Sequence, residues 1–292
     1  METVLKGRKQ IVEIAPDRPT VLIGKRISPA VRKRLAGEAV ATCIEIARNE
    51  ALAQADAGAD IININLSGTG VDEKILLPQA VQVVQEAVEI PISIEALDLE
   101  ALAASLAVCQ GKPLVNAVTG EEESLSQVLP LAAEYGAAII GRCVDEDGIS
   151  SDPYRRLEIA SKIIERAQAL AVPHQDIVID CLAQSIEADP EAVLVTVEAI
   201  RLVRNELGSN MTLDVSAVAS HLPNCATLHQ ALLAVAIIEG VNAPMVNVAR
   251  DRQAILALDT ILGRDEASMR YIRYYHYRRS GMRSLVDWEL MG

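Results

Sequence analysis

The sequence predicts an α/β fold in which eight β-strands alternate with helices along its 292 residues. Short β-branched apolar runs recur along the chain, and longer segments with helical periodicity separate them. The apolar runs are nearly continuous, which is typical of parallel strands covered on both faces. Eight strands, each followed by a helix, is the composition of a closed (β/α)8 TIM barrel. The length allows one such domain, so we predict a single domain over residues 1–292.

The elements follow in order. Residues 1–19 form an N-terminal segment in which Val4–Ile14 has two apolar runs around polar residues, typical of a hairpin that covers the N-terminal mouth of the barrel. Strands are predicted at Thr20–Gly24, Asp60–Leu66, Pro91–Glu95, Pro113–Val118, Ala137–Cys143, Asp176–Leu182, Met211–Ser216 and Pro244–Val248. Helices are predicted at Glu38–Ala57, Lys74–Val88, Leu99–Cys109, Glu121–Tyr135, Pro153–Ala171, Pro190–Leu207, Ala226–Glu239 and Arg252–Leu262.

A basic, tyrosine-rich extension occupies residues 264–292. From Arg264 to Arg283, six arginines stand against Asp265 and Glu266, giving this stretch a formal charge of +4, and four of the six tyrosines lie between Tyr271 and Tyr277. This pattern favours a last helix packed on the barrel or on a second subunit over a nucleic-acid-binding helix.

Composition excludes several classes of protein. The net charge of −13 argues against general affinity for nucleic acid or anionic membranes. No apolar run approaches eighteen residues, and the first residues lack the layout of a signal peptide. Five widely spaced cysteines without a Cys-x-x-Cys pair indicate reduced thiols. We therefore predict a cytoplasmic protein that spans no membrane.

Polar residues gather where the predicted strands end, which is where barrels of this kind place their active sites. Carboxylates accept N–H groups and carboxamides both donate and accept, so the set predicts a pocket for a polar, nitrogen-rich ligand. Its members are Lys25, Arg26, Ser28, Asn63, Asn65, Ser67, Glu95, Asn116, Arg142, Cys143, Asp180, Cys181, Asp214, Ser216, Asn247 and Arg250.

A zinc site is an alternative that the sequence leaves open. His221, Cys225 and His229 recur every four residues, and Cys181 ends a neighbouring strand. Imidazole and thiolate groups suit Zn²⁺. Pro223 argues against one continuous helical face through His221, so separate histidines are favoured and no metal is predicted.

Several motifs resemble the pterin-binding barrels, specifically the methyltetrahydrofolate:corrinoid methyltransferases. The resemblance extends from Leu22 to about Tyr277. Residues 23–28 read I-G-K-R-I-S where that family has I-G-E-R-I-N, and residues 57–65 read A-G-A-D-I-I-N-I-N where it has A-G-A-D-x-x-D-x-N. Further matches are Leu114–Asn116, Gly136–Gly141 and Val178–Asp180.

The resemblance implies a one-carbon methyltransferase. In that family, cobalt(I) of a corrinoid partner protein attacks the N5-methyl group of methyltetrahydrofolate, and N5 gains a proton. By resemblance, Glu95, Asn116 and Asp180 would bind the pterin ring, with Asn65 and Ser216 shaping the site. Lys25 and Arg26 would meet the anionic folate tail or the corrinoid partner. A homodimer is also implied.

The strand ends depart from the family pattern. Lys25 replaces an acid, Asn63 an Asp, and Ala217 the strand-seven Asn that hydrogen-bonds near N5. Asp214 is a candidate substitute acid. Losing one preorganised polar contact costs about 10²–10³ in rate, so two alternatives stay open. One is a non-catalytic folate-binding or subunit-forming relative. The other is a methyltransferase for a different donor, possibly assisted by zinc.

Overall fold

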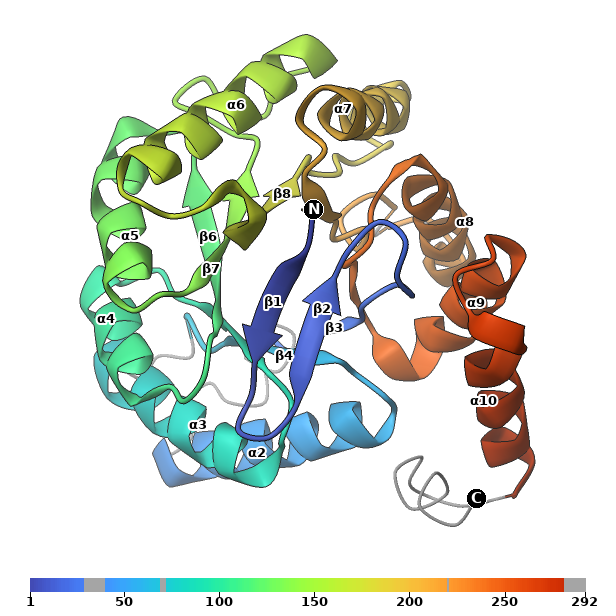
Figure 1. Cartoon of the computed structure of the whole chain (residues 1–292), viewed down its shortest axis with the longest axis horizontal. Coiled ribbons are helices and arrows are strands. Elements are labelled where there is room, and N and C mark those ends of the chain that lie inside the picture. The colour runs from blue at the N-terminus through green and yellow to red at the C-terminus, as the bar shows by residue number, and fades with distance from the viewer. Residues whose placement is uncertain (29–39, 69–71, 220, 281–292) are drawn as a thin grey trace. The chain divides into compact units, whose positions relative to one another are not determined.

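The computed structural model describes residues 1–28, 40–68, 72–219 and 221–280 (Figure 1). Its strands are β1 (Thr3–Lys6), β2 (Ile11–Ile14), β3 (Ile23–Ile27), β4 (Ile61–Asn65), β5 (Ile92–Glu95), β6 (Leu114–Thr119), β7 (Ala138–Arg142), β8 (Ile177–Asp180), β9 (Asn210–Thr212) and β10 (Met245–Val246). Its α-helices are α2 (Val40–Asp56), α3 (Glu73–Ala87), α4 (Leu99–Val108), α5 (Glu122–Glu134), α6 (Pro153–Ala169), α7 (Ala192–Leu207), α8 (Cys225–Glu239), α9 (Val248–Ile261) and α10 (Met269–Ser280). Short 3-10 helices lie at His174–Asp176 and Glu266–Ser268.

The chain forms two compact units that interleave along the sequence. The central unit contains Met1–Val4, Glu13–Pro16 and Leu114–Met245. The flanking unit contains Leu5–Val12, Asp17–Pro113 and the described residues from Val246 onward.

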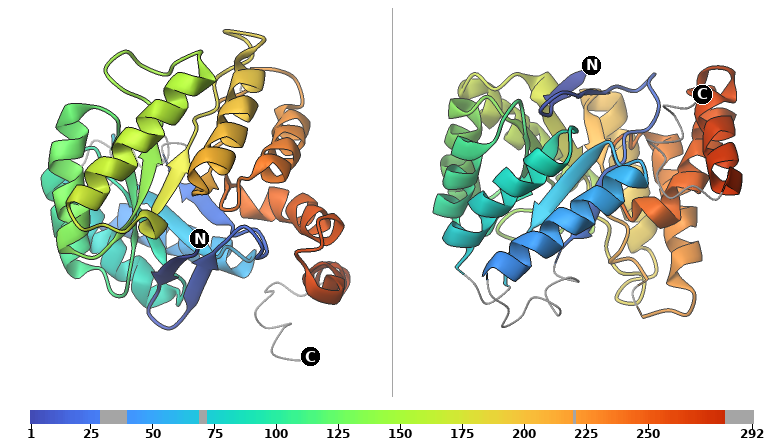
Figure 2. Two further views of the ribbon diagram at one scale, coloured as in Figure 1. Left: turned by 45° about the horizontal axis from the view of Figure 1, so that its top comes forward. Right: turned by 90° about the horizontal axis from the view of Figure 1, so that it is seen from below.

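In the flanking unit, strands β3, β4 and β5 are parallel and adjacent in sequence order. Helices α2, α3 and α4 pack one on the next outside these strands (Figure 1). All five residues of β4 are buried, as the continuous apolar run predicts for a strand covered on both faces. Helix α10 packs along α9, which confirms the prediction of a last basic helix (Figure 2).

In the central unit, strands β6, β7, β8 and β9 are also parallel and in sequence order. A parallel bridge between Asp214 and Met245 continues the ladder toward β10. Helices α5 to α8 pack in succession around these strands (Figure 1). Consecutive parallel strands with a helix after each confirm the predicted fold class, the (β/α)8 TIM barrel.

The N-terminal hairpin is confirmed as β1 and β2. Asn210, the first residue of β9, donates its amide to Thr3 Oγ1 and to the carbonyl of Ile14, both at 2.8 Å. Lys6 forms an antiparallel bridge with Lys112, just before β6. The hairpin therefore contacts the chain where strands begin, at the end opposite to the predicted active site. In the described ranges, no helix is both long and apolar enough to cross a membrane.

All eight predicted strands differ from the observed ones by at least one residue, and the largest differences are at β3 and β9. Strand β3 runs to Ile27 and includes Lys25 and Arg26, since pairing with β4 continues past the apolar residues. Strand β9 is shorter than predicted and ends at Thr212, while Asp214 turns back to bind Ser216. Residues 38–39 of the first predicted helix, Glu38–Ala57, and residues 281–292 of the C-terminal extension lie outside the described residues. The single-domain organisation stays a prediction.

Asp259 on α9 is buried and links two distant parts of the flanking unit. Its carboxylate accepts from the Thr20 amide at 3.0 Å and from the Thr20 hydroxyl at 2.6 Å, and it lies 3.5 Å from Arg270. Burial raises the pKa of Asp259 despite these contacts. An acid whose folded-state pKa is raised contributes stability that is complete below its unfolded pKa and is lost as the pH rises through the folded value.

We therefore expect Asp259→Asn to change the pH dependence of stability. The free energy of unfolding of the wild type, relative to that of the variant, should fall as the pH rises from 4 to 7. Denaturant titrations at several pH values measure this difference, with the exposed Asp17→Asn as control. If the unfolding free energy of the wild type relative to the variant rose with pH, burial would not be the dominant influence on the pKa of Asp259.

Candidate functional site

The carboxyl ends of β6, β7 and β8 bring a carboxamide, a guanidinium and a carboxylate together in the central unit. Arg142 is the register partner of Asp180 across β7 and β8. Its Nη2 donates to Asn116 Oδ1 on β6 at 2.7 Å. Asn116 is 2% exposed and Asp180 is 4% exposed. Sequence reasoning placed Arg142 at a strand end without assigning it a role. The structure shows that it orients Asn116, whose amide nitrogen lies 3.7 Å from Met245 Sδ.

Asp180 is held by the turn that follows β8. Its Oδ1 accepts the backbone N–H of Leu182 at 2.9 Å. Leu182 has a φ of 59°, an uncommon conformation for a residue of this type. The tight turn keeps the carboxylate at the strand end, where it can accept N–H groups from a ligand.

Behind Asp180, the Arg156 side chain is completely buried. It donates to the carbonyls of Cys181 and Leu182, each at 2.8 Å, and to that of Ser150 at 2.7 Å. It also donates to Gln184 Oε1 at 2.6 Å. Arg156 therefore fixes the turn that carries Asp180. Sequence reasoning missed it, because an arginine on an amphipathic helix usually faces solvent.

Asp214 and Ser216, the candidate catalytic pair, are in contact with each other. Asp214 Oδ1 accepts from the Ser216 backbone amide at 2.8 Å and from its hydroxyl at 2.6 Å. Ala217 follows and is exposed. The structure therefore places a carboxylate after β9 and no carboxamide at position 217.

The flanking unit has its own polar cluster on β4 and β5. Ser93 Oγ donates to Asn63 Oδ1 at 2.9 Å, and Asn63 Nδ2 donates to Glu95 Oε2 at 3.0 Å. Ser93 and Asn63 are buried, whereas Glu95 is half-buried. The Asn63 side-chain amide, which the sequence predicts to bind a ligand, therefore orients Glu95 instead. Nothing in the sequence predicts the hydrogen bond from Ser93 to Asn63, because Ser93 is a single polar residue within an apolar strand.

The other predicted ligand residues of this unit are engaged locally. Asn65 Oδ1 accepts from the amide and hydroxyl of Ser67 at 3.1 and 2.8 Å. Arg26 forms an ion pair with Glu50 at 3.1 Å, which favours a structural role for its side chain. Lys25 is half-buried on β3. Their roles toward a ligand stay predictions.

We expect Asn63→Asp to destabilise the flanking unit in a pH-dependent way. The change replaces an N–H···O bond with two carboxylates about 3 Å apart, and like charges raise the pKa of such a pair. The variant should therefore lose about 1–3 kcal/mol of unfolding free energy at pH 8 and less at pH 5. Chemical denaturation of the single variants and of Asn63→Asp with Glu95→Gln measures the coupling. If adding Glu95→Gln did not restore the unfolding free energy lost in Asn63→Asp, a direct contact between positions 63 and 95 would be contradicted.

The zinc alternative gains no support from geometry. Among the residues that the structure describes, no group of three or more His, Cys, Asp or Glu side chains is placed to hold a metal ion. Cys181 is buried, His221 is exposed and His229 is buried, while Cys225 begins α8. A hydrogen bond with Cys181, together with burial, raises the pKa of the Cys143 thiol.

Comparison with known families decides the class. A model described as pterin binding enzyme matches residues 33–247. The chain belongs to the pterin-binding enzyme family. Asn116, Arg142, Asp180 and Asp214 all lie inside the matched range of this pterin-binding protein.

Relatives of this pterin-binding protein include methyltransferases. It is 26% identical to the methylcorrinoid:tetrahydrofolate methyltransferase of Eubacterium limosum, over 89% of this chain and 98% of that protein. It is 25% identical to the methionine synthase of Mycobacterium tuberculosis over 87% of this chain, which corresponds to 23% of that longer protein. These similarities support a methyl-transfer role.

Solved structures with the same fold include dihydropteroate synthases. The Xanthomonas albilineans enzyme with 4-aminobenzoic acid matches with a TM-score of 0.69 at 17% identity, covering 89% of this chain and 98% of that one. The Stenotrophomonas maltophilia enzyme matches with a TM-score of 0.65 at 16% identity, covering 89% and 98% of the two chains. At these identities the likeness shows the fold.

Proposed function

We propose that this pterin-binding protein is a methyltransferase that moves a methyl group between methyltetrahydrofolate and a corrinoid carried by a separate protein. The observation that carries the proposal is the placement of buried Asn116 and Asp180 beside one arginine, Arg142, at adjacent strand ends. The near-full-length similarity to a methylcorrinoid:tetrahydrofolate methyltransferase supports the same reaction.

The donor and acceptor chemistry of these groups fits a pterin. The pterin ring presents an amino group and ring N–H groups, which require acceptors of the kind that Asp180 provides. The Asn116 oxygen accepts from Arg142, and its amide nitrogen, which lies 3.7 Å from Met245 Sδ, is proposed to donate to a ligand acceptor when the ligand binds. The corrinoid of the partner supplies the methyl acceptor or donor. Asp214 is proposed to transfer a proton from its carboxyl group to N5 as the methyl group leaves. A homodimer in the cytoplasm stays a prediction.

The test has a binding part and a turnover part. Calorimetric titration with 5-methyltetrahydrofolate, tetrahydrofolate and a pterin fragment measures binding. Methyl transfer to free or protein-bound cobalamin, followed by the absorbance change of the corrinoid, measures turnover. We expect micromolar binding of the folates and measurable transfer. No binding to any of the three would show that the strand ends recognise another ligand, and the folate proposal would be dropped.

A second candidate function rests on Ala217. Because this exposed position has no carboxamide, a folate-binding relative without turnover is the alternative. Ala217→Asn distinguishes the two. An active wild type excludes the binding-only alternative, and activity found in the variant alone supports it.

A further inference from the structure

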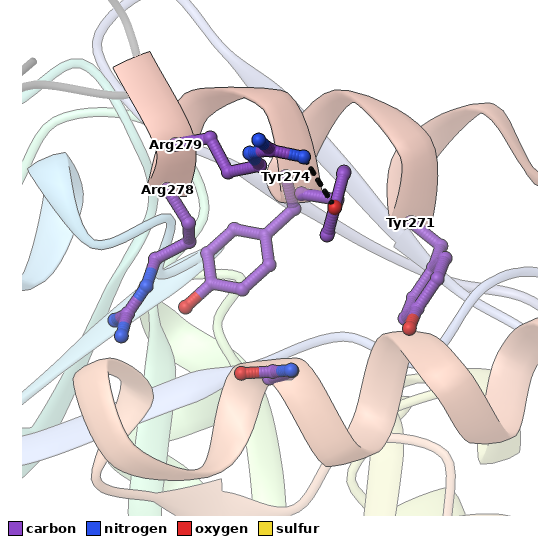
Figure 3. A pocket seen from close by; sticks show the side chains of 6 residues that line it. Tyr271, Tyr274, Arg278 and Arg279 are labelled. Atoms are coloured by element: carbon purple, nitrogen blue, oxygen red, sulfur yellow. Dashed lines mark hydrogen bonds between the residues drawn. The ribbon is translucent and has the colours of Figure 1, made fainter. Parts of the chain in front are cut away.

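A small cavity lies between helices α9 and α10, and the folate proposal does not use it. Its volume is about 170 Å³. Three tyrosines, two arginines and one glutamine line it: Tyr271, Tyr274, Tyr275, Arg278, Arg279 and Gln253 (Figure 3). Five of these six residues come from α10 and one from α9.

Tyr274 gives the cavity a fixed aromatic wall. Its side chain is 5% exposed and packs on Leu256 of α9. The guanidinium of Arg252 lies 5.2 Å from the ring centroid, within the range of a cation–π contact. Arg252 is itself held by the carbonyl of Ala57 at 3.0 Å, next to Gly58, whose φ of 88° and lack of a side chain leave room for the guanidinium.

Tyr271 gives the opposite wall, one helical turn earlier. Both rings point from α10 toward the neighbouring helix, with open space between them (Figure 3). The start of α10 is fixed, since the Asp265 carboxylate accepts the backbone amides of Arg270 at 3.0 Å and Tyr271 at 2.9 Å. These two bonds fix the backbone from which the Tyr271 side chain projects.

The rim of the cavity is cationic. Arg278 lies beside the Tyr274 ring, and Arg279 donates to the Tyr275 hydroxyl at 2.9 Å (Figure 3). Within the described ranges, neither of these guanidinium groups lies within ion-pair distance of a carboxylate. Helix α10 has four arginines and no acidic residue in a chain of net charge −13. This local charge fits an anionic group.

The size of the cavity restricts the ligand. Pockets for drug-sized ligands measure about 300–1,000 Å³, so this one has room for a single ring system. Tyrosine rings offer stacking faces and edges to a planar heterocycle. The Gln253 amide can both donate to and accept from ring substituents. Arginine pairs with phosphate through two parallel N–H···O bonds.

We propose that the α9–α10 cavity binds a nucleoside phosphate, with the base against Tyr271 over a floor formed by Tyr274 and the phosphate against Arg278 and Arg279. A free phosphate anion could use only the contacts with Arg278 and Arg279. A free nucleoside could use only the aromatic contact with its base. The site is independent of the proposed folate activity, because none of its residues belongs to the strand-end clusters.

The experiment is a calorimetric titration of the full chain with ADP, adenosine and inorganic pyrophosphate. We expect ADP to bind at least about tenfold more tightly than either of the others, because only ADP uses both halves of the site. Arg278→Gln should weaken ADP binding about tenfold or more. The matched control is Arg273→Gln, which removes the same charge from the same helix at an exposed position that does not line the cavity.

Tyr271→Ser separates base from phosphate recognition. It should weaken ADP and leave pyrophosphate unchanged, while thermal melting shows whether the fold persists. Absence of ADP binding at millimolar concentration would overturn the proposal, as would equal effects of Arg273→Gln and Arg278→Gln. Equal affinity for pyrophosphate and ADP would show a non-specific anion surface. Tighter binding of a short single-stranded oligonucleotide than of ADP would show a nucleic-acid surface, and both results would overturn the assignment.

Discussion

Asp180→Asn is expected to weaken 5-methyltetrahydrofolate binding by about 10- to 100-fold, because a charged acceptor of ligand N–H groups is lost. The asparagine retains an oxygen for the Leu182 amide, which Asp180 Oδ1 accepts at 2.9 Å. Its amide nitrogen then meets pterin N–H groups donor to donor. Calorimetric titration measures the affinity, and thermal melting should show little change.

Asp214→Asn provides the comparison. Asp214 follows β9 and also accepts a backbone amide two residues later, at 2.8 Å. As the proposed N5 acid, it should affect the rate of methyl transfer more than folate affinity. If Asp214→Asn abolished folate binding and Asp180→Asn did not, the proposed roles of binding residue and N5 acid would be reversed.

Arg156→Met is expected to cost about 3–5 kcal/mol of unfolding free energy, the range for breaking a buried charged network. The change leaves the carbonyls of Ser150, Cys181 and Leu182 without their donor in a buried region. Each such group costs about 1–3 kcal/mol. Chemical denaturation measures the loss, and folate affinity should fall as the Asp180 turn loosens.

The control for this variant is Arg166→Met on the same helix. Arg166 pairs with Glu122 at 2.7 Å, and both side chains are about half exposed. An exposed ion pair contributes about 0–1 kcal/mol, so this change should have little effect. Equal losses in the two variants would mean that the Arg156 network does not stabilise the turn.

The sequence predicted the fold class well because the signal is repeated eight times. The continuous run Ile61–Asn65 becomes β4 with every residue buried. The apolar pattern does not predict the end of a strand that polar residues extend, as Lys25 and Arg26 extend β3. The pairing with β4 is irregular at these two residues and resumes at Ile27, which only the neighbouring strand shows.

Contacts between side chains of the candidate site were less predictable. Strand ends located Asn116 and Asp180, since every parallel strand delivers its last residues to the same edge. The bond from Arg142 to Asn116, however, joins residues on two strands and depends on register. Asn63 was predicted to meet the ligand, yet its amide is bound to Glu95. Polar residues at strand ends therefore predict where the site lies more reliably than they predict what each residue does there.

The interleaving of the two units has a consequence for biosynthesis. Thr20 and Asp259 are bonded partners in the flanking unit, although 239 positions separate them in sequence. Contacts of such high sequence separation slow folding, because a long loop must close before they form. On the ribosome, residues 114–245 emerge before the last helices of the flanking unit exist. The contact between Thr20 and Asp259 therefore cannot form until α9 has been synthesised, so the flanking unit is the later of the two to complete its long-range contacts.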